Sequence, residues 1–109
     1  MNPVRIALLT APDAETGKRI ARQLVDERLA ACVNVLPGVT SIYRWQGAVE
    51  EAGEVMLVVK TVQERVPALV ARVPELHPHK VPEVVVLAVE SGLPAYLQWV
   101  VGETSKVVV

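Results

Sequence analysis

The sequence predicts an α+β domain of ferredoxin-like type, with elements in the order β-α-β-β-α-β and a short additional helix at the C-terminal end. Three observations lead to this. The 109 residues, 51% of them hydrophobic, suit one domain covering residues 1–109. Runs with strand-like composition alternate with runs at helical spacing, and the eight prolines fall where elements should start, turn or stop. We therefore expect one antiparallel sheet with two helices on the same face.

The first strand and first helix are separated by the turn Thr10-Ala11-Pro12-Asp13. The apolar run Val4–Leu9 predicts a strand, and Asp13 is a suitable N-cap for a helix that begins at Ala14. The apolar side chains of the following segment recur at helical spacing: Ile20, Ala21, Leu24, Val25 and Leu29. The pattern predicts an amphipathic helix packed on a sheet.

The middle of the chain predicts a long hairpin. Residues Ala31–Trp45 are rich in β-branched side chains and are interrupted by Pro37-Gly38, which suits a bulge or bend. Residues Gln46 to Ala48 can turn the chain back into a second strand, Val49–Thr61. The two strands should pair in antiparallel orientation.

The C-terminal third returns to helical spacing in Glu64–Leu76, where Pro74 should end or distort the helix. A loop punctuated by prolines, residues 77–82, leads to a last strand at Val84–Val89. Residues Pro94–Glu103 predict the short terminal helix. The sequence leaves open whether the Val107–Val109 tail is ordered.

Charge and composition argue against several classes of function. The 11 basic and 12 acidic residues are mixed along the chain, so no basic stripe predicts a nucleic-acid partner. No apolar run approaches the roughly 20 residues of a membrane span. The first residues lack the layout of a signal peptide, and the single cysteine, Cys32, cannot form an internal disulfide. We expect a cytoplasmic protein with no membrane segment.

Two predicted strands are apolar on both sides. In this topology one face of the sheet should be polar at every second position, yet Val55–Val59 and Val84–Val89 are apolar at consecutive positions. The chain has no third layer for the second face. A homo-oligomer that packs sheet against sheet is the simplest solution.

The order of several motifs resembles the CutA divalent-cation-tolerance family over essentially the whole chain. The longest motif is Leu29–Gly47. The shorter ones are Thr10-Ala11-Pro12-Asp13, Val58-Val59-Lys60-Thr61, His77-Pro78, Pro82-Glu83 and Tyr96-Leu97-Gln98-Trp99. The resemblance implies a tight trimer whose hairpins reach neighbouring subunits. It also implies a cytoplasmic bacterial protein linked to tolerance of divalent metals such as copper, and a trimer similar to that of PII signalling proteins.

This sequence departs from the family pattern at two positions. Some bacterial members carry a cysteine in the first strand that is a proposed copper ligand, where this chain has Leu9. The tyrosine usual after His-Pro is His79. The first change removes a thiolate ligand and the second adds an imidazole, so whether His79 compensates stays open.

His77 and His79 are the candidate metal ligands. They flank Pro78, which favours an extended backbone, and side chains two apart in such a segment point the same way. With Glu75, Glu83 or a second subunit, they would form a nitrogen and oxygen set suited to copper, nickel or zinc. The alternative is two histidines on a solvated loop.

A second candidate site is a cleft between subunits. It would collect Tyr43, Trp45, Lys60, His77 and Glu83, because Lys60 should end the third strand and Glu83 should open the fourth. Such a cleft could bind a small anionic ligand through Lys60. The alternatives are subunit packing for the aromatic residues and a solvated strand end for Lys60.

Function is predicted from these features together. The leading hypothesis is a non-enzymatic trimer that binds divalent metal ions, copper or zinc, or a small ligand between subunits. The second is an enzyme acting on a small molecule in a cleft around Lys60, His77 and Glu83. The third is a structural trimer that recruits another protein. No local signature of an organic cofactor, nucleotide or hydrolase is present, and Cys32 is expected to be a small buried hydrophobe.

Overall fold

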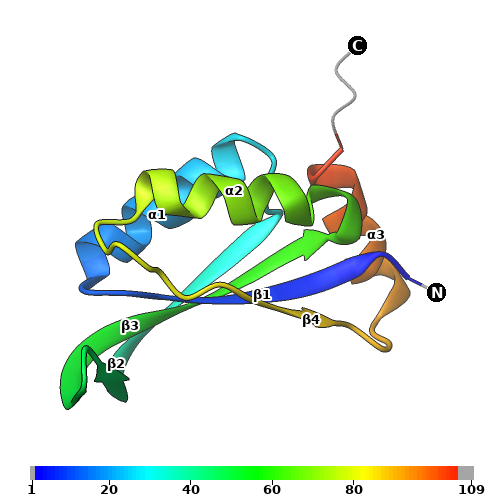
Figure 1. Cartoon of the computed structure of the whole chain (residues 1–109). Coiled ribbons are helices and arrows are strands. Elements are labelled where there is room, and N and C mark those ends of the chain that lie inside the picture. Colours follow the sequence, from blue (N-terminus) through cyan, green and yellow to red (C-terminus); the bar gives the residue numbers. More distant parts are fainter. Residues whose placement is uncertain (1, 106–109) are drawn as a thin grey trace.

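The computed structural model describes residues 2–105, and the Val107–Val109 tail lies outside them. The predicted order of elements is confirmed (Figure 1). The elements are β1 (Val4–Ala11), α1 (Ala14–Asp26), β2 (Cys32–Trp45), β3 (Ala48–Val62), the 3₁₀ turn η1 (Gln63–Arg65), α2 (Val66–Leu76), β4 (Val85–Ala88) and α3 (Pro94–Glu103).

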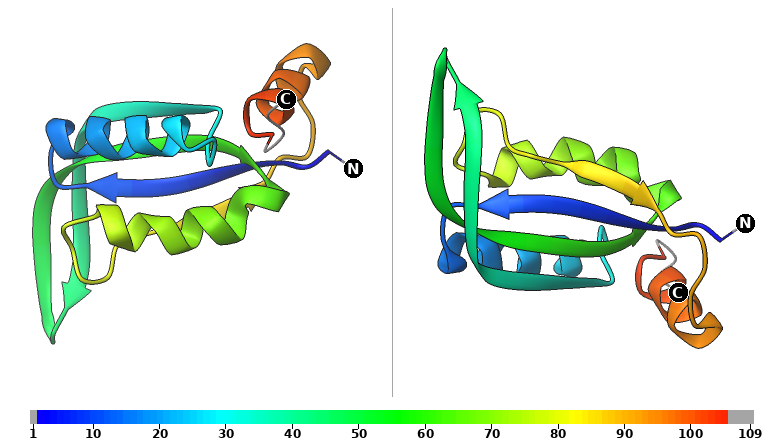
Figure 2. Two further views of the ribbon diagram at one scale, coloured as in Figure 1. Left: turned by 90° about the horizontal axis from the view of Figure 1, so that it is seen from above. Right: turned by 90° about the horizontal axis from the view of Figure 1, so that it is seen from below.

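The four strands form one antiparallel sheet in the order β2-β3-β1-β4. Helices α1 and α2 lie side by side on one face of it, as predicted (Figure 2). The main core lies between these two layers; its largest fully buried side chains are Leu9, Ile20, Leu24, Leu57 and Leu69. Asp13 caps α1 as expected, because its carboxylate accepts the Thr16 N–H at 2.7 Å.

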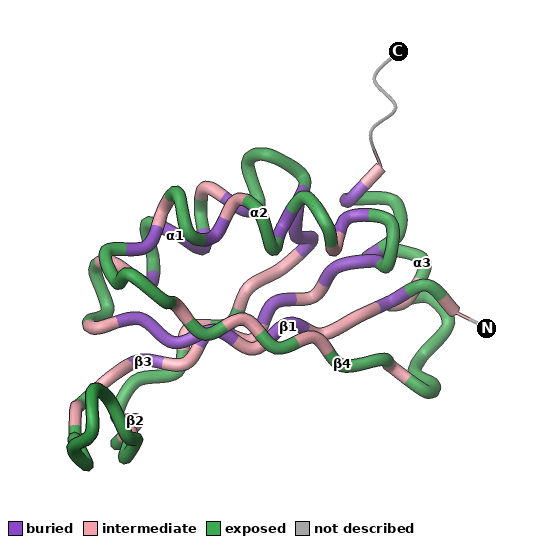
Figure 3. Tube along the Cα trace, in the orientation of Figure 1, coloured by how far each residue is buried: buried purple, intermediate pink, exposed green. Residues whose placement is uncertain are grey.

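Strands β2 and β3 extend well beyond the rest of the sheet. Pairing of β3 with β1 begins at Val55, so residues 39–54 pair only with each other and form an arm. The predicted bulge lies between Leu36 and Val39, where Gly38 has φ +75°, and Gly47 turns the chain with φ +83°. Residues 42–51 at the end of the arm are all exposed, whereas its base is partly buried (Figure 3).

The second face of the sheet is apolar and carries no helix over its centre. Strand alternation places here the side chains that do not enter the core. They are Ile6 and Leu8 of β1, Leu36 of β2, Met56 and Val58 of β3, and Val85 and Leu87 of β4. We call this surface the open face. Its members on the edge strands, Leu36, Val85 and Leu87, are 43–49% exposed. On the inner strand β3, Met56 and Val58 lie on this face while Leu57 and Val59 enter the core, so β3 is apolar on both sides as predicted.

Helix α3 packs at the end of the sheet on a small cluster of its own. Val100 is fully buried there against Val4, Ala31 and Val62. The buried Arg65 donates from Nε to the Thr104 carbonyl at 2.7 Å. This bond satisfies a carbonyl that the end of α3 leaves without a helical partner.

Pro74 distorts α2 less than expected. The helix continues through Pro74 to Leu76, and the His77 N–H still bonds the Val73 carbonyl at 2.9 Å. Proline removes one helical N–H, the one that would reach Val70. Val70 is 43% exposed, so water can satisfy its carbonyl, and the helix ends two residues later than Pro74.

Candidate functional site

The loop after α2 is anchored by His77. Its side chain is 7% exposed, and Nε2 lies 2.8 Å from the Thr10 carbonyl oxygen near the end of β1. The His79 N–H points at Nδ1 of His77, 3.0 Å away. A carbonyl only accepts, so Nε2 carries the proton and Nδ1 accepts. The loop therefore holds a neutral imidazole with both ring nitrogens hydrogen-bonded.

His79 is the exposed member of the pair. The two ring centroids are 4.8 Å apart, with ring planes inclined by 56°. In the described part of the chain, no hydrogen bond involves the ring nitrogens of His79. The structure brings His77 and His79 together, but the Nδ1 lone pair of His77 is already in use. The two-imidazole clamp stays a prediction, and it would require His77 to break a hydrogen bond.

Two glutamates were proposed to complete the metal site. Glu75 lies 3.3 Å from Arg72, on the outer side of α2, and Glu83 is exposed. The pairing of β4 with β1 begins at Val85, so Glu83 precedes the strand rather than opening it as expected. Among residues 2–105, no group of three or more histidine, cysteine, aspartate or glutamate side chains is arranged to hold a metal ion.

Lys60 lies on the same side of the sheet as the open face. It pairs with Ile6 of β1 and Cys32 of β2, and its Nζ contacts the Asn34 side-chain oxygen. The strand continues past Lys60 to Val62, so Lys60 is not the strand end that the sequence suggested. The reason is that β1 reaches far enough to pair Val4 with Val62. Lys60 is instead a cation beside an apolar surface.

The arm carries the aromatic residues of the predicted cleft. Tyr43 and Trp45 are 45% and 44% exposed near its tip. Tyr43 faces Glu50, which is ten residues before Lys60 along β3, or about 33 Å. Within one chain, therefore, the aromatic side chains and Lys60 are far apart. The predicted cleft would need the arm of another copy.

Cys32 lies near the phenol of Tyr96 from α3. Burial, followed by the nearby Cys32 thiol, raises the pKa of the Tyr96 phenol above its usual value. Cys32 is partly rather than fully buried, because β2 is an edge strand of the sheet. The sequence did not single out Thr10, Asn34 or Tyr96 as site residues, although all three lie in motifs used for the family resemblance.

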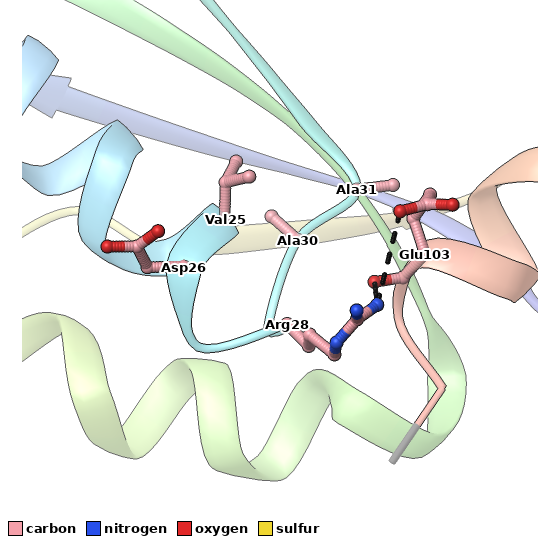
Figure 4. Close-up of a pocket in the computed structure, with 6 residues that line it drawn as sticks. All are labelled: Val25, Asp26, Arg28, Ala30, Ala31 and Glu103. Carbon is pink, nitrogen blue, oxygen red and sulfur yellow. Dashed lines mark hydrogen bonds and ion pairs between the residues drawn. The ribbon is translucent and has the colours of Figure 1, made fainter. Parts of the chain in front are cut away.

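A surface pocket of about 220 Å³ lies elsewhere, between the C-terminal ends of α1 and α3. Figure 4 shows its lining, with Arg28 directed toward Glu103. The Arg28 guanidinium donates to the Glu103 carbonyl at 3.1 Å and lies 4.0 Å from its carboxylate. The charged groups of Arg28 and Glu103 thus contact each other, and the pocket contains none of the predicted site residues.

The fold and the loop define a class of protein. The chain is a ferredoxin-like α+β protomer with an uncovered apolar sheet face, a projecting hairpin arm and an exposed histidine on an anchored loop. The CutA1 divalent ion tolerance protein family matches residues 5–103. The chain belongs to this family.

Individual relatives agree with the family assignment. The divalent-cation tolerance protein CutA of Thermus thermophilus is 52% identical over 94 residues, which cover 86% of this chain and 91% of that protein. Protein CutA of Mus musculus is 48% identical over 104 residues, and the match spans 95% of this chain but 59% of that longer protein. The crystal structure of CutA from Xylella fastidiosa has a TM-score of 0.92 at 44% identity, covering 94% of this chain and 99% of that one.

Relatives are named for different compartments. A similar protein of Arabidopsis thaliana is called chloroplastic, and a similar structure from Archaeoglobus fulgidus is called periplasmic. No helix within residues 2–105 has the length and apolar character needed to cross a membrane. The cytoplasmic location stays a prediction.

Proposed function

We propose that this CutA-family chain works as a homotrimer that binds divalent metal ions, copper or zinc, through the loop after α2 and so contributes to metal tolerance. The observation that carries the metal part is His79, an exposed imidazole on a loop fixed to the sheet through His77. Imidazole suits copper and zinc, whereas calcium and magnesium prefer oxygen ligands.

Assembly is supported by the surface of the single chain. The open face presents apolar side chains from all four strands, and a monomer would leave them in water. The arm adds exposed apolar side chains such as Ile42 and Val49, at 69% and 64% exposure. A neighbour that covers the open face and receives the arm would bury both surfaces, and three copies fit the trimer expected for the family.

A metal ion bound by His79 would need further ligands from other residues of the loop or from a neighbouring copy. Glu83 is exposed a few residues further along the same loop, and a neighbouring copy can supply carboxylate or imidazole groups. A site shared between subunits would make metal affinity depend on assembly, because the ligand set is incomplete in one chain.

A small anionic ligand is the second candidate, and Lys60 favours it. Its ammonium lies next to Asn34 beside the open face, where a neighbouring arm could bring Tyr43 and Trp45. Such binding would suit a sensing role similar to that of PII proteins. An enzyme that uses Lys60, His77 and Glu83 together is less favoured for two reasons. Both ring nitrogens of His77 are hydrogen-bonded. Lys60 pairs with Ile6, four residues along β1 from the Thr10 that contacts the loop, so it lies away from His77.

The test combines mass and metal binding. Light scattering should give about three times the 11.8 kDa chain mass. Calorimetric titration of Cu²⁺ and Zn²⁺ into metal-free protein should show saturable binding that His79→Ala removes. Weak, non-saturating heats that the substitution leaves unchanged would refute direct metal binding and direct the search to anionic ligands.

A further inference from the structure

We infer that His77 is a positioning residue and that His79 alone supplies an imidazole to a metal ion at the loop after α2. The role of His79 rests on the proposed metal binding. The role of His77 does not: its neutral imidazole bridges the Thr10 carbonyl and the His79 N–H, and we call this pair of hydrogen bonds the bridge. In place of a clamp of two imidazoles, His77 holds the loop in position and His79 binds the metal.

The hydrogen bonds of His77 leave it nothing with which to coordinate a metal. A neutral imidazole binds a metal through its one lone pair. Here Nδ1 directs that lone pair at the His79 N–H, 3.0 Å away, and Nε2 directs its proton at the Thr10 carbonyl, 2.8 Å away. A metal at Nε2 would leave the buried Thr10 carbonyl without a hydrogen bond, and a metal at Nδ1 would leave the part-buried His79 N–H without one. Leaving a buried polar group unbonded costs free energy.

Burial adds to that cost. The His77 side chain is 7% exposed, and Thr10, whose carbonyl it bonds, is 9% exposed. The backbone N–H of His77 also closes the end of α2 on the Val73 carbonyl at 2.9 Å. Three bonds in different directions therefore tie together the end of α2, the end of β1 and the loop.

The bridge fixes the backbone of His79. The His79 N–H donates to Nδ1 of His77, and Pro78 between them restricts the backbone further. His79 itself is exposed, and its ring lies 4.8 Å from the His77 ring. Supporting groups of this kind orient metal ligands, and their loss commonly weakens metal affinity about 10- to 100-fold.

Substitution by glutamine separates a supporting role from a ligand role. The amide of His77→Gln can still donate through N–H and accept through C=O, but it is a poor ligand for Cu²⁺ or Zn²⁺. We expect His77→Gln to retain Zn²⁺ affinity within about threefold, His77→Ala to lose about tenfold, and His79→Ala to lose saturable binding. Equal loss in His77→Gln and His79→Ala would overturn the assignment.

The imidazole nitrogen signals provide a test that needs no metal. In ¹⁵N-labelled full-length protein, His77 should show a protonated Nε2 and an unprotonated, hydrogen-bonded Nδ1. Adding Zn²⁺ should shift the ring nitrogens of His79 and leave those of His77 in place. A protonated Nδ1, or a mixture of both tautomers, would refute the bridge.

Failure of the proposed function can be recognised separately. If wild-type protein binds no metal, metal binding at the loop is refuted together with the ligand role of His79. The bridge is then decided by the tautomer and by hydrogen exchange of the His79 amide. Exchange should accelerate in His77→Ala and be largely restored in His77→Gln; unchanged exchange in both variants would overturn it.

Discussion

A charge placed at the centre of the open face tests whether a second copy covers that face. Val58 lies on the inner strand β3, between Asn34 of β2 and Leu8 of β1. In an isolated chain Val58 is half-buried on the open face, so an aspartate there would keep contact with water and Val58→Asp should fold. In an assembly that covers the face, the carboxylate would be buried without a partner, at a cost of several kcal/mol.

The expected effect on assembly is large. Each 1.4 kcal/mol weakens an equilibrium tenfold, so several kcal/mol at each subunit weakens association more than about a thousandfold. Light scattering of Val58→Asp at micromolar concentration should give the 11.8 kDa mass of one chain, with circular dichroism reporting retained secondary structure. Val70→Asp is the matched control, because Val70 is 43% exposed on α2, in the helix layer opposite the open face.

Two outcomes would refute this reasoning. A folded Val58→Asp protein with the same mass as wild type would show that the open face is not the interface. A wild-type mass of one chain would show that the apolar face stays exposed to water. A fall to the mass of one chain in both Val58→Asp and Val70→Asp would show that added charge, rather than its position, disrupts assembly.

Three further predictions concern stability of the protomer, measured by urea or acid denaturation at fixed protein concentration. Thr61→Val removes the buried hydroxyl that donates to the Leu29 carbonyl at 2.7 Å, so the free energy of unfolding should fall by about 1–3 kcal/mol. Glu27→Gln should flatten the acid transition: hydrogen bonding by Arg72 lowers the pKa of the Glu27 carboxyl, so its stabilisation is present above the ordinary value of 4.5 and is lost as pH falls through the lower folded value. Asp13→Ala removes the N-cap of α1 and should lower the denaturation midpoint.

Each stability prediction has a matched comparison. Thr40→Val makes the same chemical change at an exposed position of the arm and should leave stability nearly unchanged. Glu50→Gln, also exposed on the arm, should not alter the acid transition as Glu27→Gln does. Asp13→Ser keeps a capping oxygen and should recover most of the midpoint. Equal effects within any of these pairs would contradict the contact assigned to that side chain.

The order of elements could be read from the sequence because local signals are strong. The alternation of strand-like and helical periods predicted every strand and helix, and Asp13 predicted the start of α1. Pro37-Gly38 predicted the bulge in the long hairpin because glycine permits the positive φ found there. Consecutive apolar residues in β3 and β4 predicted an uncovered face without any knowledge of the sheet order.

The sequence placed Lys60 near Glu83 because both were read as strand ends. The actual ends depend on pairing between strands: β1 extends β3 to Val62 and begins its pairing with β4 only at Val85. Strand limits of this kind depend on which backbone groups find partners across the sheet. The ends of β3 and β4 therefore could not be predicted from local composition.

What the sequence by itself determined is the fold, the family and the position of two histidines on one loop. What only the tertiary structure decided is how those histidines differ. Spacing two residues apart made them look equivalent, but a contact with Thr10, 67 residues away along the chain, buries His77 and uses its nitrogens, while His79 stays exposed. The protonation state and free lone pairs of a histidine follow from its partners, and such distant partners meet only when the chain folds.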